Sequence, residues 1–244
     1  MINGYFRLFI QVIFTLTAGC GAARNSSARH YQQEGFLPLV KGSGLKQWDY
    51  KPGHHGHWVA KKGLISYDGR SIEADRSLWT LKKYKNFILV ADVRLTRKPE
   101  MLPMPIVLPS GNYALNSNGS KKESPVPYAG DTGIYLRGES KSQVNIGYRN
   151  IGSGEIYGYR VDTTLSAAVR AGVTPSVKAD KPPGEWNSFI ITLKGDRVTI
   201  NLNGIEVISN AQLPGMPTEG RIALQDDHES GNTFEFKNLY IKEL

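Results

Sequence analysis

Apolar and polar residues alternate along most of this chain, and that pattern predicts many short β-strands. The clearest stretch covers residues 130–160, where apolar positions alternate with polar or aromatic ones. Period-two alternation is typical of a strand that buries one face and exposes the other. We therefore expect two or three adjacent strands here. Their buried positions are Ile134, Leu136, Val144 and Ile146.

The opposite face of these strands carries hydrogen-bonding and aromatic side chains. Aromatic rings stack on the C–H faces of sugars, and amides and guanidinium groups bind hydroxyls. This composition favours a carbohydrate site, and the alternative is a solvated sheet face of an ordinary β-protein. The side chains expected on this face are Tyr135, Arg137, Gln143, Asn145, Tyr157, Tyr159 and Arg160.

Alternation on both sides of this stretch predicts an all-β fold without long helices. Asn203-Gly204 indicates a type I′ hairpin turn, and a phase change after Phe236 indicates a β-bulge. Residues 165–169 indicate a helical turn. Many short strands separated by turns are typical of a sandwich or jelly roll. The further strands are expected at residues 58–60, 64–67, 77–80, 86–96, 186–194, 198–202, 205–208, 220–225 and 233–243.

Residues 98–129 break this rhythm, because they are rich in proline, asparagine, serine and glycine. A segment of that length is too long for a tight turn. Long loops in compact domains are usually functional or disordered. We interpret this one as an insertion that borders a functional site.

Charge and cysteine content narrow the class of protein. The net charge of +8 is compatible with binding to nucleic acid. However, the lysines and arginines are scattered, and neither a basic helix nor an RNA-binding signature is present, so we expect no nucleic-acid partner. The single cysteine, Cys20, excludes an internal disulfide.

The first 20 residues are similar to the signal segment of a bacterial lipoprotein. Arg7 precedes a short apolar stretch, and Thr17-Ala18-Gly19-Cys20 resembles a lipobox, although leucine is more usual where Thr17 stands. The alternative is an ordinary secretory signal. We expect a signal over residues 1–20, a tether over 21–33 and a single domain over 34–244. Lipidation of Cys20 would anchor the protein to a membrane of the bacterial cell envelope, facing the periplasm or the exterior.

A histidine-rich stretch precedes the regular strands. His54, His55 and His57 stand within four positions, between Gly53 and Trp58. Neutral imidazole binds zinc and similar ions, so a divalent metal site is one hypothesis, and His54 and His55 would be its ligands. The spacing is tight and no helix holds it. The alternative is a polar loop at the start of a strand.

Several segments resemble the 3-keto-disaccharide hydrolase family, also described as 3-keto-glucoside 1,2-lyases and 3-keto-2-hydroxy-glucal hydratases. Their order and spacing match over nearly the whole chain from Gly35 to Leu244. The resemblance implies a concanavalin A-like jelly roll of two antiparallel sheets and a location in the bacterial envelope. The clearest of the segments are GFLPLVKGSGLKQW, DTGIYLRG, SQVNIGYRNIGSGEIYGYR, ADKPPGEWNSFIITLKGDRVTINLNGIEVI and GRIALQDDHESGNTFEFKNLYIKEL.

The resemblance also implies a substrate and a reaction. A ketone at C3 of a glucoside acidifies the C2 proton, so a base can remove it. The leaving sugar then departs from C1 by elimination, and water adds to the resulting double bond. Such a site needs a base, donors at the ketone oxygen and a proton donor for the leaving oxygen. The same fold serves lectins, so a noncatalytic carbohydrate-binding protein is the alternative.

Candidate residues follow from matching the family's motifs to this sequence. His54 and His55 would act as base or metal ligands, Arg137 would hold the C3 oxygen, and Glu155 would be the acid or base. Gln143 and Asn145 replace a Glu-x-Gln pair of broader relatives, and amides cannot act as bases. The catalytic candidates are His54, His55, Arg137, Glu155, Tyr157 and His228. The substrate-binding candidates are Trp79, Tyr135, Gln143, Asn145, Tyr159, Arg160 and Asp226.

Overall fold

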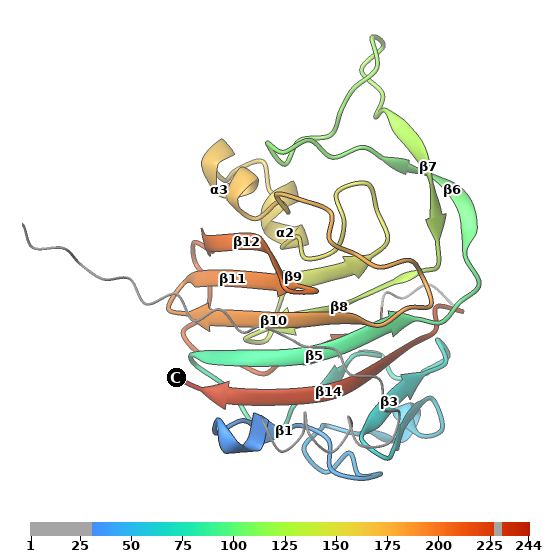
Figure 1. Cartoon of the computed structure of the whole chain (residues 1–244), viewed down its shortest axis with the longest axis vertical. Coiled ribbons are helices and arrows are strands. Elements are labelled where there is room, and N and C mark those ends of the chain that lie inside the picture. The colour runs from blue at the N-terminus through green and yellow to red at the C-terminus, as the bar shows by residue number, and fades with distance from the viewer. Residues whose placement is uncertain (1–30, 227–230) are drawn as a thin grey trace, which may run out of the picture.

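Two antiparallel sheets packed face to face form the body of the protein in a computed structural model that describes residues 31–226 and 231–244 (Figure 1). The first sheet has the order β12 (Ile205–Gln212), β11 (Arg197–Leu202), β10 (Asn187–Lys194), β5 (Phe87–Leu95), β14 (Phe234–Glu243), β3 (Leu64–Tyr67) and β2 (Trp58–Lys61), and β1 (Leu37–Pro38) pairs with β14. The second sheet has the order β4 (Leu78–Trp79), β13 (Ala223–Gln225), β8 (Asp131–Leu136) and β9 (Glu139–Gly147).

The core lies between the two sheets, where their apolar faces meet. The second sheet contributes a row across its strands of Leu78, Leu224, Ile134 and Val144, each less than 2% exposed. The first sheet contributes alternate residues such as Phe87, Phe189 and Phe236, which belong to the same cluster. The expected two-sheet sandwich of the concanavalin A-like jelly-roll type is therefore confirmed, and its cause is period-two burial in nearly every strand.

Two local predictions from the sequence are also confirmed. Asn203 and Gly204 have φ values of 54° and 85°, as a type I′ turn between β11 and β12 requires. The pairing of β14 with β5 shifts between Lys237 and Tyr240, and Asn238 in this bulge has a φ of 49°. The bulge turns Leu239 and Ile241 toward the core after Phe236.

The segment after β9 corrects one expectation, because it forms a helix instead of a third strand. Helix α2 spans Tyr157–Val161, and the amide of Arg160 donates to the carbonyl of Ile156. Gly158 lies so close to β9 that a Cβ there would stand 2.5 Å from the Lys141 carbonyl oxygen. The alternation of Tyr157, Gly158 and Tyr159 looks like a strand in sequence, but its glycine serves close helix packing. A second short helix, α3 (Ala167–Gly172), follows.

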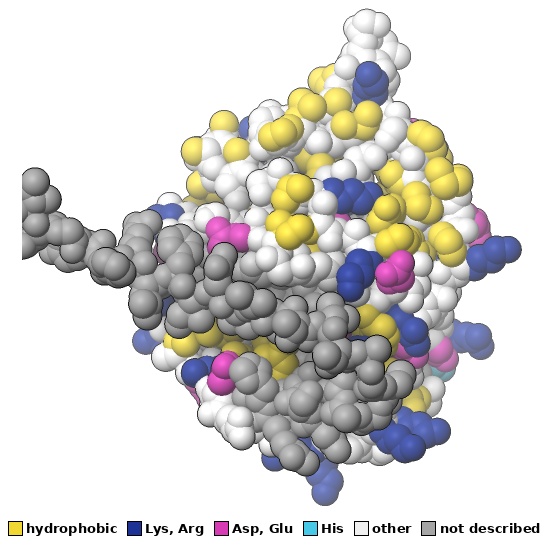
Figure 2. All heavy atoms as spheres, viewed as in Figure 1, with side chains coloured by type: hydrophobic (Ala, Val, Ile, Leu, Met, Phe, Trp, Pro, Cys, Tyr) yellow, Lys and Arg dark blue, Asp and Glu magenta, His cyan; other side chains and the backbone are white. Residues whose placement is uncertain are grey.

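Residues 98–129, expected to be an irregular insertion, form a projecting two-stranded ribbon. Strands β6 (Glu100–Pro105) and β7 (Glu123–Tyr128) pair with each other, and bridges such as Leu115 with Lys121 extend the pairing toward the tip. Figure 2 shows hydrophobic side chains gathered over this ribbon, where Met101 and Leu115 are about three-fifths exposed. Residues 106–113 bring the ribbon back to the body, where a Cβ on Gly111 would stand 2.8 Å from the Arg170 carbonyl oxygen of α3.

The described part of the chain begins beside β14. Tyr31, within the stretch expected to be a tether, stacks on Tyr240 with ring centroids 5.0 Å apart and contacts Phe36 at 5.5 Å. The proposed signal segment and Cys20 lie outside the described residues. Among the described residues, no helix has the length and apolar character needed to cross a membrane.

Arg137 lies just beyond β8, in the turn to β9, rather than on the polar face of the sheet. Its side chain is 3% exposed, and it donates to the carbonyl oxygens of Lys85, Gly195 and Pro217. It also donates to Asn86 Oδ1 at 3.2 Å. These acceptors come from three other turns, so Arg137 is a structural clamp. The expectation that it holds a substrate oxygen is not supported by this placement.

Replacing Arg137 with lysine should destabilise the protein by about 3 kcal/mol, because one ammonium group cannot reach all of these buried carbonyls. Urea unfolding of the two proteins measures the difference. Arg197→Lys is the control, since the Arg197 side chain is 47% exposed and its change should stay within about 0.5 kcal/mol. Equal stability of Arg137→Lys and the unchanged protein would contradict the proposed structural role of Arg137.

Candidate active site

The outer face of the second sheet carries the polar side chains predicted by the alternation in β8 and β9. One row across the strands contains Trp79, Ala223, Tyr135 and Gln143. The next row contains Gln225, Gly133 and Asn145. The face is therefore divided into an aromatic side near β4 and an amide side near β9, and we take it as the candidate site.

An amide network crosses the middle of this face. Gln143 Nε2 on β9 donates to Gln225 Oε1 on β13, passing over Gly133 of β8. A Cβ at Gly133 would stand 2.6 Å from Gln143 Nε2 and 2.8 Å from Gln225 Oε1, so only glycine leaves room for this contact. Gln225 also hydrogen bonds with the hydroxyl of Tyr135. The network fixes three polar side chains from three strands.

Glu155 forms a buried polar cluster at the amide edge of the sheet. The segment after β9 folds back, so that the amide of Asn145 donates to the Glu155 carbonyl at 2.9 Å and the amide of Gly154 donates to the Asn145 carbonyl at 2.8 Å. This places Glu155 Oε1 where it accepts from Asn145 Nδ2 at 2.8 Å. Arg160 Nε from α2 donates to Glu155 Oε2. Glu155 and Arg160 are 1% and 2% exposed, so the ion pair is shielded from water.

Arg160 also connects this cluster to the ribbon. Its guanidinium donates to the Gly111 carbonyl and to the Tyr113 hydroxyl, each at 3.2 Å. The rings of Tyr113 and Tyr157 lie 4.9 and 5.6 Å from the guanidinium carbon. The base of the ribbon is therefore held against the edge of the candidate site by one buried cation.

Trp79 and Tyr135 form the aromatic side of the face. Their ring centroids are 5.6 Å apart, above the small Ala223 that pairs with both residues. Trp79 Nε1 donates to Asp75 Oδ2 at 2.6 Å, which fixes the indole. Burial, with a smaller effect of the Asp75 charge, raises the pKa of Tyr135 to about 12. Tyr135 is consequently a neutral phenol near pH 7 that can donate a proton but cannot act as a base.

Asp226 lies at the end of β13 and is fully buried. Its Oδ2 accepts from the Tyr67 hydroxyl at 2.6 Å, and Arg76 stands 3.8 Å away. Burial and the hydrogen bond to Asp226 raise the pKa of Tyr67 well above its usual range. These contacts connect β13 of the second sheet to β3 of the first. The Asp226 carboxylate is therefore engaged by Tyr67 and Arg76 within the protein.

The three histidines diverge, and the structure brings only one of them to the edge of the site. His54 is 1% exposed; its Nδ1 accepts from the Lys51 amide and its Nε2 donates to the Asp75 carbonyl. Both ring nitrogens are therefore used within the protein, and His54 supports the loop that carries Asp75. His55 is exposed, with its ring 4.7 Å from that of Tyr50. His57 pairs with Asp68 at 3.1 Å.

The remaining predicted residues are distributed as follows. Tyr159 belongs to the core cluster and donates to the Pro214 carbonyl at 3.3 Å, so its hydroxyl does not reach the polar face. Tyr157 is 39% exposed beside Arg160. His228 lies outside the described residues. Within residues 31–226 and 231–244, no group of three or more histidine, cysteine, aspartate and glutamate side chains is placed to hold a metal ion.

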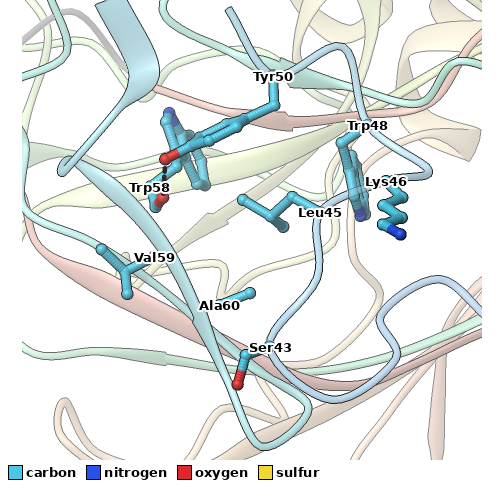
Figure 3. Close-up of a pocket in the computed structure, with 8 residues that line it drawn as sticks. All are labelled: Ser43, Leu45, Lys46, Trp48, Tyr50, Trp58, Val59 and Ala60. Carbon is cyan, nitrogen blue, oxygen red and sulfur yellow. Dashed lines mark hydrogen bonds between the residues drawn. The ribbon is translucent and has the colours of Figure 1, made fainter. Parts of the chain in front are cut away.

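A surface hollow of about 430 Å³ lies elsewhere, between β2 and the segment around Leu45 (Figure 3). Trp48 and Trp58 line it but are only 2% and 0% exposed, so neither offers a ring face for stacking. The Tyr50 hydroxyl closes one side by donating to the Trp58 carbonyl at 3.1 Å. Residues of the polar sheet face do not line this hollow.

Several residues of the site were missed by sequence reasoning. Gln225 follows the apolar Leu224, so alternation predicts that its side chain points away from the core. Its contact with Gln143 could not be predicted, because the two residues are 82 positions apart in the sequence. Gly133 is a small residue in a strand, which is a known signal for close approach of another group. Arg149 and Tyr113 reach the site from loops, where no periodic pattern predicts direction.

Comparisons with known proteins agree on fold and family. The model of the 3-keto-alpha-glucoside-1,2-lyase-like domain matches residues 35–242. Two solved structures from Parabacteroides distasonis ATCC 8503, each provisionally named a glycosyl hydrolase, share 19% and 18% sequence identity with this chain, with TM-scores of 0.55 and 0.56. The alignments cover 88% and 86% of this chain and 96% and 84% of theirs. A comparison with curated proteins finds no significant match.

Glu155→Gln should cost about 3–5 kcal/mol of stability, because it leaves Arg160 buried without its counter-charge. The double variant Glu155→Gln with Arg160→Gln should recover part of that loss, since no unpaired charge stays buried. Urea unfolding of the single and double variants measures both effects.

Glu243→Gln provides the matched control for this pair. Its partner Lys82 and Glu243 itself have side chains 58% and 47% exposed, so removing the charge should cost less than about 1 kcal/mol. An effect of Glu155→Gln as small as that of Glu243→Gln would show that the buried pair does not stabilise the fold.

Proposed function

The chain belongs to the family of 3-keto-alpha-glucoside-1,2-lyase-like domains, and on that premise we propose that it cleaves the glycosidic bond of a 3-keto-glucoside or 3-keto-disaccharide. A base removes the C2 proton, and the electron pair of that C–H bond passes to the ketone as an enolate. The enolate then expels the oxygen on C1, which takes up a proton, and a C1=C2 double bond remains. Addition of water returns a proton to C2 and places a hydroxyl on C1, so the net reaction is hydrolysis.

One observation carries this proposal beyond the family match, namely the buried carboxylate of Glu155 at the polar sheet face. Glu155 is held from two sides by Asn145 and Arg160, which leaves its geometry well defined. Proton removal next to a ketone requires a fixed base and polar groups at the oxygen where charge develops. It does not require the pair of carboxylates used by ordinary glycosidases.

We assign Glu155 as the base and Tyr135 as the proton donor to the leaving oxygen. Tyr135 is assigned that role because its phenol is protonated near neutral pH and it lies on the same sheet face as Gln143 and Asn145. The ring of Trp79 beside it offers an apolar surface for the departing sugar. His54 is assigned the indirect role of supporting the Asp75 loop, and Tyr157 remains a second donor candidate beside Arg160.

The first experiment offers the purified protein 3-keto-trehalose or methyl 3-keto-glucoside, and separately the unoxidised sugars. We expect cleavage of the keto sugars alone, because only they have an acidic C2 proton. A parallel run with a chelator tests whether a metal ion takes part. Binding of either sugar without cleavage would contradict the enzyme and favour the carbohydrate-binding alternative.

Exchange of the C2 proton in D₂O identifies the base. Glu155→Gln should lower the exchange rate by at least about 100-fold, since general-base catalysis contributes 10²–10⁴-fold. Glu155→Asp keeps the charge that pairs with Arg160, and because it shortens the reach it should also slow exchange in a folded protein. Undiminished exchange in Glu155→Asp and Glu155→Gln would remove Glu155 from the mechanism.

We also propose that Cys20 carries a lipid that anchors the protein in the bacterial envelope. The support is the resemblance of Thr17-Ala18-Gly19-Cys20 to a lipobox. Cys20→Ser should shift the protein from the membrane fraction to the soluble fraction, because a single acylated residue supplies the anchor. An unchanged distribution would favour an ordinary secretory signal.

A further inference from the structure

Three buried side-chain atoms have no hydrogen-bond partner within the described part of the chain; one is Arg170 Nε on α3, and the other two belong to residues that interact with Glu155. Of these two, one is an acceptor, Asn145 Oδ1, and the other is a donor, Arg149 Nε. Folded proteins pair nearly all of their buried polar atoms, so each exception calls for a physical reason. An unpaired acceptor and an unpaired donor near one buried carboxylate indicate a ligand that offers the complementary groups.

The orientation of the Asn145 amide follows from its neighbour. Asn145 Nδ2 donates to Glu155 Oε1 at 2.8 Å, and an ionised carboxylate only accepts hydrogen bonds, so the amide cannot be reversed. Oδ1 is consequently turned away from Glu155. The side chain is 4% exposed, which leaves this oxygen in a shielded position where a hydroxyl donor would be bound strongly.

Arg149 lies over the neighbouring position of the same sheet face. Its terminal nitrogen pairs with Asp131, whose residue is opposite Gly147 in the register of β8 and β9. A Cβ at Gly147 would stand 2.9 Å from Asp131 Cβ and 3.4 Å from Arg149 Nε, so the glycine makes room for Asp131 and lets the guanidinium lie in contact above it. Asn145 and Gly147 are two residues apart on β9, which corresponds to about 7 Å along the same face.

We propose that Asn145 and Arg149 together recognise the adjacent hydroxyl and ketone of the oxidised sugar. Asn145 Oδ1 accepts from the C2 hydroxyl, and Arg149 Nε donates to the C3 oxygen. Asn145 and the Gly147 position beneath Arg149 share one face of β9, so both groups can address the same bound ring. The inference rests on the proposed function and goes beyond it by naming the residues that determine specificity.

The two contacts differ in when they matter during the reaction. The C2 hydroxyl is present in the bound substrate, so Asn145 contributes to binding from the start. The C3 oxygen gains negative charge as the C2 proton leaves, so the guanidinium of Arg149 stabilises the transition state more than the substrate. Arg149 should therefore act mainly on kcat.

The test measures kcat and KM of the full chain with methyl 3-keto-glucoside and with its 2-deoxy analogue. Arg149→Lys keeps a charge for Asp131 but loses the Nε donor, and it should lower kcat about 100-fold with little change in KM. The unchanged protein should prefer the sugar with the C2 hydroxyl by about 10-fold in kcat/KM, as one neutral hydrogen bond predicts. In Asn145→Ala that preference should disappear.

Controls separate specificity from folding. Arg94→Lys alters an arginine that pairs with Glu235 on the first sheet, and it should leave both kinetic constants unchanged. Arg149→Gln and Asn145→Ser serve as second variants, and urea unfolding confirms that each variant is folded.

Two results would overturn the inference and can be told apart. If the unchanged protein cleaves the keto sugar while Arg149→Lys keeps its kcat and Asn145→Ala keeps the preference for the C2 hydroxyl, the specificity assignment fails and the proposed function stands. If the unchanged protein cleaves neither sugar, the proposed function fails and the inference fails with it.

Discussion

The register of the four strands in the second sheet determines where every candidate side chain lies. Because the side-chain period in a strand is two, a slip of β9 by one residue along β8 would turn Gln143 into the core and bring Val144 to the surface. Burial of Ile134 and Val144 against the first sheet prevents that slip. The hydrophobic core thus specifies which side chains form the polar face.

The buried pair of Glu155 and Arg160 extends this order beyond the sheet. Glu155 is fixed to β9 through both backbone and side-chain bonds to Asn145, and Arg160 carries the connection onward to Gly111 and Tyr113 of the ribbon. A buried ion pair is a weak source of stability, because desolvation offsets much of the attraction. Its larger effect here is positional, since it joins β9, α2 and the ribbon through defined hydrogen bonds.

Sequence alone predicted the sheet faces well and the side-chain partners poorly. Alternation correctly placed Tyr135, Gln143 and Asn145 on one face, because local burial decides that property. It failed for Arg137, where the strand had ended, and for Tyr157 and Tyr159, where a glycine packing against β9 allowed a helix. The partner of Glu155 is Arg160 on α2, a pairing that no pattern in the sequence indicated. Such pairings depend on how distant turns meet, which no single-segment pattern contains.

Glycine placement shows how the polar face can hold more side chains than its strands supply. At Gly133 the missing Cβ lets two glutamine side chains meet above β8, and at Gly147 it leaves room for Asp131, which pairs with Arg149. Each glycine weakens its strand slightly through greater unfolded-state entropy. The space above each glycine is occupied by polar side chains from neighbouring strands or loops. The face therefore carries amide and guanidinium groups even where its own strand has no side chain. The proposed site for an oxidised sugar needs that density of donors and acceptors, and Gly133 is the local sequence feature that lets two of the amides meet.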